Sequence, residues 1–218
     1  DALSKTGLKH IQACSFVNPR LVPGWADAEK VVESFDAHED VEYTGLYFNG
    51  NGLDRALAFK DKLTISGSIS LTASEGFTKK NLNRTHAENM AAMERHVMSH
   101  LELGIPVNRI GVMAAFGCNY QGDISPETVI KTLEDGMQIA AQTGAEITLF
   151  SLADTMGWAA PHRIEKVVGE VRNVWPDMTI SLHLHDTRGL AIANAYSALK
   201  MGVRQFDSTV GGLGGCPF

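Results

Sequence analysis

The sequence predicts an α/β fold of the (β/α)8 TIM-barrel type, and three observations support this. Apolar, β-branched runs alternate with amphipathic helical stretches along the chain, which is typical of parallel strands joined by crossover helices. The glycine-rich phosphate motif that usually follows the first strand of a doubly wound sheet is absent there. Polar residues follow the expected strand ends, where barrels carry their functional groups. We therefore expect one barrel domain over residues 1–218.

About seven strands are expected from the apolar runs. They lie at residues 8–15, 41–48, 62–70, 107–116, 145–152, 178–185 and 203–210. A complete barrel of this type has eight strands. Since the chain starts in what resembles the end of a helix and stops within a loop, we expect the first strand and the last helix region to lie outside it.

Local signals mark the helices between these strands. Thr85 and Glu88 fit a capping box ahead of a long helix that ends near Gly104. Ser125 supplies an N-cap before a proline, and Pro161 starts a further helix that runs to about residue 173. Glycines stand where helices pass into strands, as left-handed C-caps do. These are Gly7, Gly104, Gly144 and Gly202.

Composition and charge exclude several classes of protein. The net charge of -6 and pI near 5.7 give no basic surface for nucleic acid or an anionic membrane. No apolar stretch reaches the ~20 residues of a membrane span. The three cysteines are far apart and odd in number, which indicates free thiols in a cytoplasmic protein. The sequence does not specify the oligomeric state, and a homo-oligomer is one option.

The most informative motif is His183-Leu184-His185-Asp186 at the end of the sixth expected strand. Side chains alternate along a strand, so His183 and His185 point the same way and can bind one metal ion. Two hydrogen-bonded surface histidines are the alternative. Asp186 either orients one of these histidines or caps the next helix, and both roles are open.

Other strand ends supply further candidates. Asp154 is a possible third ligand, although capping the following turn is a common role for aspartate. Cys216 follows a glycine-rich loop, which would place a mobile thiol over a metal site, whereas a lone cysteine is usually a small buried hydrophobe. Lys79 and Lys80 are candidates for binding the phosphates of a cofactor, or an ordinary solvated pair.

Six segments together resemble the hydroxymethylglutaryl-CoA lyase family, a group of metal-dependent Claisen-type TIM-barrel lyases. The resemblance covers essentially the whole chain, and the cysteine loop is its most specific part. Related synthases resemble the chain at the His-x-His strand and at residues 189–194, but they lack the cysteine loop. The six segments are residues 15–19, 77–81, 117–122, 154–157, 183–187 and 212–218.

The resemblance implies a retro-Claisen cleavage of a 3-hydroxy-3-methylglutaryl-CoA-like thioester to acetyl-CoA and a keto acid. It implies that His183 and His185 bind Mg2+ or Mn2+, which chelates the substrate's hydroxyl and carboxylate oxygens. Asp154 would act near that hydroxyl, with His183 helping to relay its proton. Cys216 would handle the proton of the acetyl-CoA enolate.

The resemblance also places Ser15 and Ser151 near the substrate, and it shows two departures. Gln12 stands where the family usually has glutamate, and Arg188 where it usually has tyrosine. An amide in place of a carboxylate, with an added guanidinium, favours a more anionic or differently placed acyl group, so both residues are substrate-binding candidates.

An Arg-Asp pair and an Asn ligand of the family are expected outside the chain, so these 218 residues alone should bind metal poorly. Two alternatives to a lyase stay open at this point. One is a condensing synthase of the same superfamily, and the other is a non-catalytic barrel that binds CoA or a metabolite.

Overall fold

The computed structural model describes residues 2–212 and divides them into two compact units, one up to Ser66 and one from Gly67 onward. The calls on Cys216 and its neighbours therefore lie outside the described residues. Each unit is built from parallel strands joined by helices, as the alternation of apolar runs predicted.

The first unit contains a two-stranded parallel sheet. A bulge between Gln12 and Cys14 interrupts the pairing of its two strands. Its elements are η1 (Leu3–Lys5), β1 (His10–Ser15), η2 (Pro23–Trp25), α1 (Ala28–Ser34), β2 (Glu42–Leu46) and α2 (Gly50–Leu57). The Phe16 ring packs directly against Gly45. A Cβ at position 45 would lie 2.5 Å from that ring, so only glycine fits there without a shift. This close approach packs the sheet of the unit against its own core.

The second unit contains a five-stranded parallel sheet whose spatial order, β3-β4-β5-β6-β7, follows the chain order. A doubly wound sheet reverses its order at a switch point, whereas a barrel does not. The strands are β3 (Gly67–Thr72), β4 (Val107–Met113), β5 (Leu149–Ala153), β6 (Thr179–His183) and β7 (Gln205–Phe206). The sequential order is the barrel pattern that the sequence predicted.

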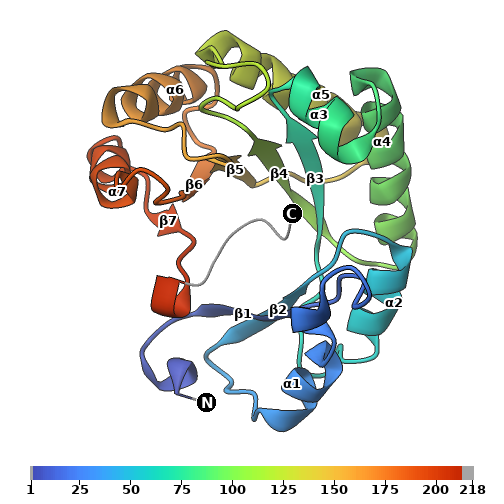
Figure 1. The fold of residues 1–218 in the computed structure, drawn as a ribbon. Coiled ribbons are helices and arrows are strands. Elements are labelled where there is room, and N and C mark those ends of the chain that lie inside the picture. The colour runs from blue at the N-terminus through green and yellow to red at the C-terminus, as the bar shows by residue number, and fades with distance from the viewer. Residues whose placement is uncertain (1, 213–218) are drawn as a thin grey trace. The chain divides into compact units, whose positions relative to one another are not determined.

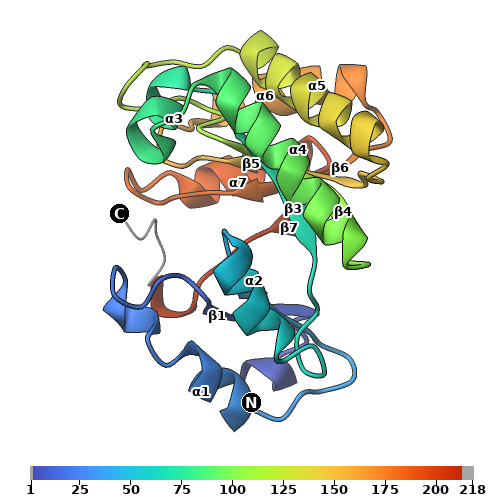
Figure 2. The same ribbon diagram turned by 90° about the vertical axis from the view of Figure 1, so that its right-hand side faces the viewer.

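Helices cover the outer face of this sheet, as Figure 1 shows, and Figure 2 shows α4 lying along β3 and β4. They are α3 (Glu75–Leu82), α4 (His86–Glu102), α5 (Pro126–Thr143), α6 (Pro161–Val174) and α7 (Ala191–Lys200), followed after β7 by η3 (Val210–Gly212). The core lies between the helices and the strands, and its fully buried members include Ile110, Leu133, Phe150, Ile164 and Leu182. This rigid layer fixes where the strands end.

Helix starts and stops are the best predicted local features. Thr85 and Glu88 form the expected capping box of α4. Ser125 caps α5, which the left-handed Gly144 ends at φ 80°. Both signals are local in sequence, because a cap bonds to amides two or three residues away.

Several strand predictions were wrong in extent. The strand predicted to reach residue 116 ends at Met113, and the strand predicted from residue 145 begins at Leu149. The third strand begins at Gly67 and not near Lys62, because Leu63 is buried in the core of the first unit and the Thr64 amide donates to the Tyr43 carbonyl (2.7 Å). The last predicted strand shrinks to Gln205–Phe206. Apolar runs alone did not show where one unit ends and the next begins.

Candidate active site

Polar side chains of the second unit meet where β5 and β6 end. These strands are parallel neighbours, with Ala153 opposite His183. Beyond the paired residues, the Asp154 amide donates to the His183 carbonyl (2.8 Å), and the Asp207 amide donates to the Leu182 carbonyl (3.2 Å). The ladder thus brings the residues that follow three strands to the same edge.

His183 and His185 lie together, as strand alternation predicted. Their Nε2 atoms are 3.2 Å apart, and their rings meet edge to face with centroids separated by 5.1 Å. His183 is the last residue of β6, and His185 follows just beyond the strand. This separation is that of a hydrogen bond between the two rings, the alternative considered above, and it is also short enough for both nitrogens to bind one ion.

Asp207 is a candidate site residue that the sequence reasoning missed. Its Oδ2 lies 2.9 Å from Nδ1 of His183, and this bond holds the pKa of the Asp207 carboxyl below its usual range. A carboxylate on Nδ1 favours the tautomer in which Nε2 of His183 carries the free lone pair. The available signal was its position: Asp207 comes directly after the strand that neighbours β6.

Asp154 is buried, with 1% of its surface exposed. Its Oδ1 accepts from the Ala159 amide (2.9 Å), whereas Oδ2 is buried with no hydrogen-bond partner among the described residues. Burial raises the pKa of this carboxyl, while amides of Ala159 and Trp158 and the charges of His185 and Arg188 oppose the rise. A buried carboxylate with one unpartnered oxygen is a candidate proton acceptor.

The other aspartate of the motif has a structural role. Asp186 accepts from the amide of Ala191 (2.8 Å), the first residue of α7, and so satisfies a free amide at the start of this helix, whose N-cap is Leu190. Of the two roles left open for this residue, the structure supports capping. Arg188, two residues later, donates to the Gly157 and Ala159 carbonyls at 2.7 and 3.0 Å.

Two further second-unit residues lie on β5 and in the loop after β4. Ser151 is half-buried on β5. Cys118 is fully buried, and its sulfur lies 2.9 Å from the hydroxyl of Ser74, the N-cap of α3. This thiol is therefore packed beneath the strand-end loops and is not a solvent-facing group.

Lys79 and Lys80 are on α3 beside a shallow pocket of about 540 Å³ that Asn83 and Tyr120 also line. The pocket is cationic, with an aromatic ring at its edge. Such a surface can meet a phosphate-bearing ligand. The structure thus brings the two lysines together at one pocket.

In the first unit, Ser15 and Gln12 are both on β1. Ser15 is buried with a hydroxyl that has no hydrogen-bond partner among the described residues, and Gln12 is exposed. Of the remaining candidates, Cys216 is outside residues 2–212.

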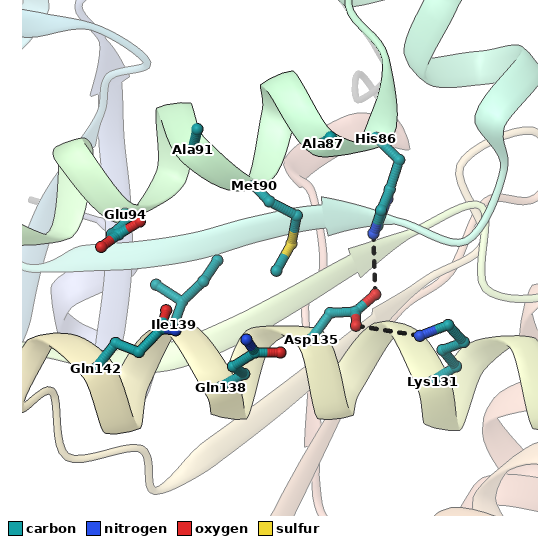
Figure 3. Close-up of a pocket in the computed structure, with 10 residues that line it drawn as sticks. All are labelled: His86, Ala87, Met90, Ala91, Glu94, Lys131, Asp135, Gln138, Ile139 and Gln142. Carbon is teal, nitrogen blue, oxygen red and sulfur yellow. Dashed lines mark hydrogen bonds and ion pairs between the residues drawn. The ribbon is translucent and has the colours of Figure 1, made fainter.

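A second groove of about 470 Å³ lies between α4 and α5, on the helical layer and away from the strand ends (Figure 3). Three of its polar side chains contact one another, since Asp135 lies 2.9 Å from His86 and 3.3 Å from Lys131.

Within residues 2–212, no group of three or more histidine, cysteine or acidic side chains is placed to hold a metal ion. In the same range, no helix is both long and apolar enough to cross a membrane.

The model of the HMGL-like family matches residues 1–216. Hydroxymethylglutaryl-CoA lyase YngG of Bacillus subtilis is 35% identical over 216 residues, which are 99% of this chain and 69% of that protein. The (R)-citramalyl-CoA lyase of Chloroflexus aurantiacus is 33% identical over 228 residues, covering 100% of this chain and 69% of that protein.

A solved structure is similar over the same span. It is an HMG-CoA lyase from Acinetobacter baumannii in complex with coenzyme A and 3-methylmalate, with a TM-score of 0.81 and 32% identity. The match covers 99% of this chain and 67% of that one. The sequential parallel sheet and this similarity agree on the TIM-barrel fold.

Proposed function

The chain belongs to the HMGL-like family. Because the relatives described above are named as lyases of CoA thioesters, we propose that it cleaves a 3-hydroxy-3-methylglutaryl-CoA-like thioester to acetyl-CoA and a keto acid. The observation that carries the proposal is the approach of His183 and His185 at the end of β6, next to the end of β5, where the Asp154 amide donates to the His183 carbonyl. Barrel enzymes place their chemistry at this end of the strands.

We propose Mg2+ or Mn2+ as the metal of this family's chemistry. Two ligands ~2.1 Å from one ion and at right angles to each other are about 3 Å apart. The Nε2 atoms of His183 and His185, 3.2 Å apart, fit that spacing. When bound, a divalent ion supplies a positive charge that makes a neighbouring substrate hydroxyl more acidic.

The chain's own residues would then handle the protons. Asp154 accepts the proton of the substrate hydroxyl through its unpartnered Oδ2, directly or with His183 as relay. The hydroxyl oxygen becomes the carbonyl of the keto acid as the adjacent carbon–carbon bond breaks, and that electron pair forms the enolate of acetyl-CoA. Cys216 donates the proton that converts the enolate to acetyl-CoA.

The remaining candidates are proposed to bind the substrate. Ser151 and Ser15 lie near the acyl group, and Gln12 influences which acyl group is accepted. Lys79 and Lys80 bind phosphates of coenzyme A, which the cationic pocket on α3 supports. We propose a cytoplasmic enzyme, since Cys14 and Cys118 are buried free thiols.

The decisive assay measures acetyl-CoA release by the full-length protein with Mg2+, with Mn2+ and with a chelator. The substrates are 3-hydroxy-3-methylglutaryl-CoA and citramalyl-CoA, because the relatives are named for both. We expect cleavage of at least one thioester, with loss of turnover in the chelator. Condensation of acetyl-CoA with a keto acid, without any cleavage, would favour the synthase alternative. Binding without turnover or a metal requirement would favour the non-catalytic barrel.

Two variants test the individual roles. Cys216→Ala should lose turnover severely and keep metal binding, and unchanged turnover would remove the cysteine from the mechanism. Lys80→Met should raise the KM for the thioester several-fold at low salt, with less effect at high salt because the charges are screened. Lys166→Met, on the outer helix α6, is the matched control and should leave KM unchanged.

A further inference from the structure

Arg188 connects two strand-end loops of the second unit. It comes from the segment between β6 and α7, and its guanidinium reaches the loop that follows β5. Nε donates to the Gly157 carbonyl (2.7 Å), and Nη2 donates to the Ala159 carbonyl (3.0 Å). Two of the three guanidinium nitrogens are thus committed to backbone oxygens of one short segment.

The same segment holds the carboxylate of Asp154. Its Oδ1 accepts from the Ala159 amide at 2.9 Å, and the neighbouring Trp158 amide, like that of Ala159, lowers the pKa of this carboxyl. The Gly157 carbonyl and the Trp158 amide belong to one trans peptide, whose C=O and N–H point in opposite directions. Arg188 therefore holds one edge of the peptide whose other edge faces Asp154.

The two loops are also in steric contact. Gly157 has φ +68°, and a Cβ there would lie 2.7 Å from the Cβ of Thr187, the residue before Arg188. Only glycine combines this conformation with this approach. The contact fixes the distance between the loops, so that the guanidinium meets both carbonyls at once.

We propose that Arg188 is a positioning residue that fixes the peptides of residues 157–159, and through their amides the orientation of the Asp154 carboxylate. One oxygen of Asp154 is held by the backbone, and the other is buried with no hydrogen-bond partner among the described residues. The positively charged donor also polarises the peptide and strengthens the amide that faces the carboxylate. The catalytic consequence rests on the proposed role of Asp154, whereas the clamp itself does not.

The test compares Arg188→Met with Arg204→Met in the full-length protein. Arg204 is a matched control, because it also donates to two backbone carbonyls, those of Leu199 and Val203, but at the end of α7. Hydrogen exchange of the Trp158 and Ala159 amides is the primary readout. We expect exchange on the order of tenfold faster in Arg188→Met and unchanged in Arg204→Met.

Steady-state kinetics supply the second readout. A displaced proton acceptor lowers kcat, on the order of 10²-fold for a misplacement of about 1 Å, and leaves substrate binding nearly intact. Arg188→Met should therefore lose kcat with KM changed by less than about threefold. The kcat of Arg188→Lys should lie between those of the wild type and Arg188→Met, because an ammonium keeps the charge but cannot donate to both carbonyls as the guanidinium does.

Two results would overturn the proposal. Unchanged exchange at Trp158 and Ala159 in Arg188→Met would show that the guanidinium does not hold the loop. A raised KM with kcat kept would show instead that Arg188 binds the substrate. If the wild-type protein cleaves no thioester, the proposed function fails, and the amide exchange alone still decides whether the clamp exists.

Discussion

Two histidine–carboxylate pairs in the second unit have the same separation and different surroundings. His183 contacts Asp207 at the end of β6, and His86 contacts Asp135 between α4 and α5, each at 2.9 Å. The second ring nitrogen of His183, Nε2, contacts Nε2 of His185. The second oxygen of Asp135, Oδ1, contacts the ammonium of Lys131. The pair at the end of β6 thus lies beside a second imidazole, whereas the pair between α4 and α5 lies beside a cation.

The contrast shows that a histidine–carboxylate pair alone does not make a metal site. A metal site needs several lone pairs aimed at one point, and a neighbouring ammonium repels a cation. Strand ends of a parallel sheet bring such donors together, since each strand contributes the residue that follows it. Between α4 and α5 (Figure 3), by contrast, the polar contacts of Asp135 end at Lys131, whose side chain is 74% exposed.

The largest effect is expected from replacing the histidine of each pair. His183→Ala should lose metal-dependent turnover by on the order of 10³-fold, because it removes one of two histidine ligands and several kcal/mol of charge stabilisation. His86→Ala should keep turnover within a factor of two. Both are measured as acetyl-CoA release with Mn2+. A comparable loss in His86→Ala would mean that the α4–α5 groove belongs to the active site.

A second prediction concerns another histidine of the outer layer. Burial, and next the charge of His100, lower the pKa of His96 to about 4 from its usual 6.5. The unfolded chain takes up this proton near pH 6.5 and the folded chain only near pH 4, so stability is lost as pH falls between these values. The loss should amount to at most about 3 kcal/mol.

Denaturant unfolding of the wild type and of His96→Gln at pH 7, 5.5 and 4 checks this. The difference between the two free energies of unfolding isolates His96, since the carboxylates titrate in both proteins. We expect the variant to lose less stability on acidification. Parallel curves would show that His96 is accessible to protons in the folded state.

The third prediction compares the carboxylates of the two pairs, Asp207 and Asp135. Asp207→Asn should weaken Mn2+ binding by about 10–100-fold, because the amide supports the His183 tautomer less strongly than a carboxylate does. Asp135→Asn should leave the affinity unchanged. Titration calorimetry measures both. Equal affinities in the two variants would show that Asp207 only packs beside the ring.

The sequence predicted what depends on near neighbours. Strand alternation correctly brought His183 and His185 together, and cap chemistry located the start of α4. Asp207 was missed because the predicted strand, residues 203–210, ran past it, whereas the strand of the structure ends at Phe206 and leaves Asp207 at its end. Its role depends on pairing with β6, and tertiary contacts of this kind leave no local signal.

The same limit applies to the loop around Asp154. The sequence placed Asp154 and Arg188 near the strand ends, but the bonds of Arg188 to carbonyls of residues 157 and 159 depend on how two loops pack. A backbone acceptor has no residue-type signature. The sequence therefore predicted Arg188 as a substrate-binding residue without any sign of its bonds to the backbone.

The smallest expected effect concerns Lys131, which closes the outer pair. Its side chain is 74% exposed and lies 3.3 Å from Asp135 at helical spacing i,i+4. Such pairs contribute ~0.3–0.5 kcal/mol, because solvent screens the charges and the long side chain loses rotamer freedom. Lys131→Met should therefore change the free energy of unfolding by less than about 0.5 kcal/mol in denaturant titrations. A loss well above 1 kcal/mol would mean that Asp135 depends on this cation, and that the outer pair is a coupled network more like the strand-end site than its exposure suggests.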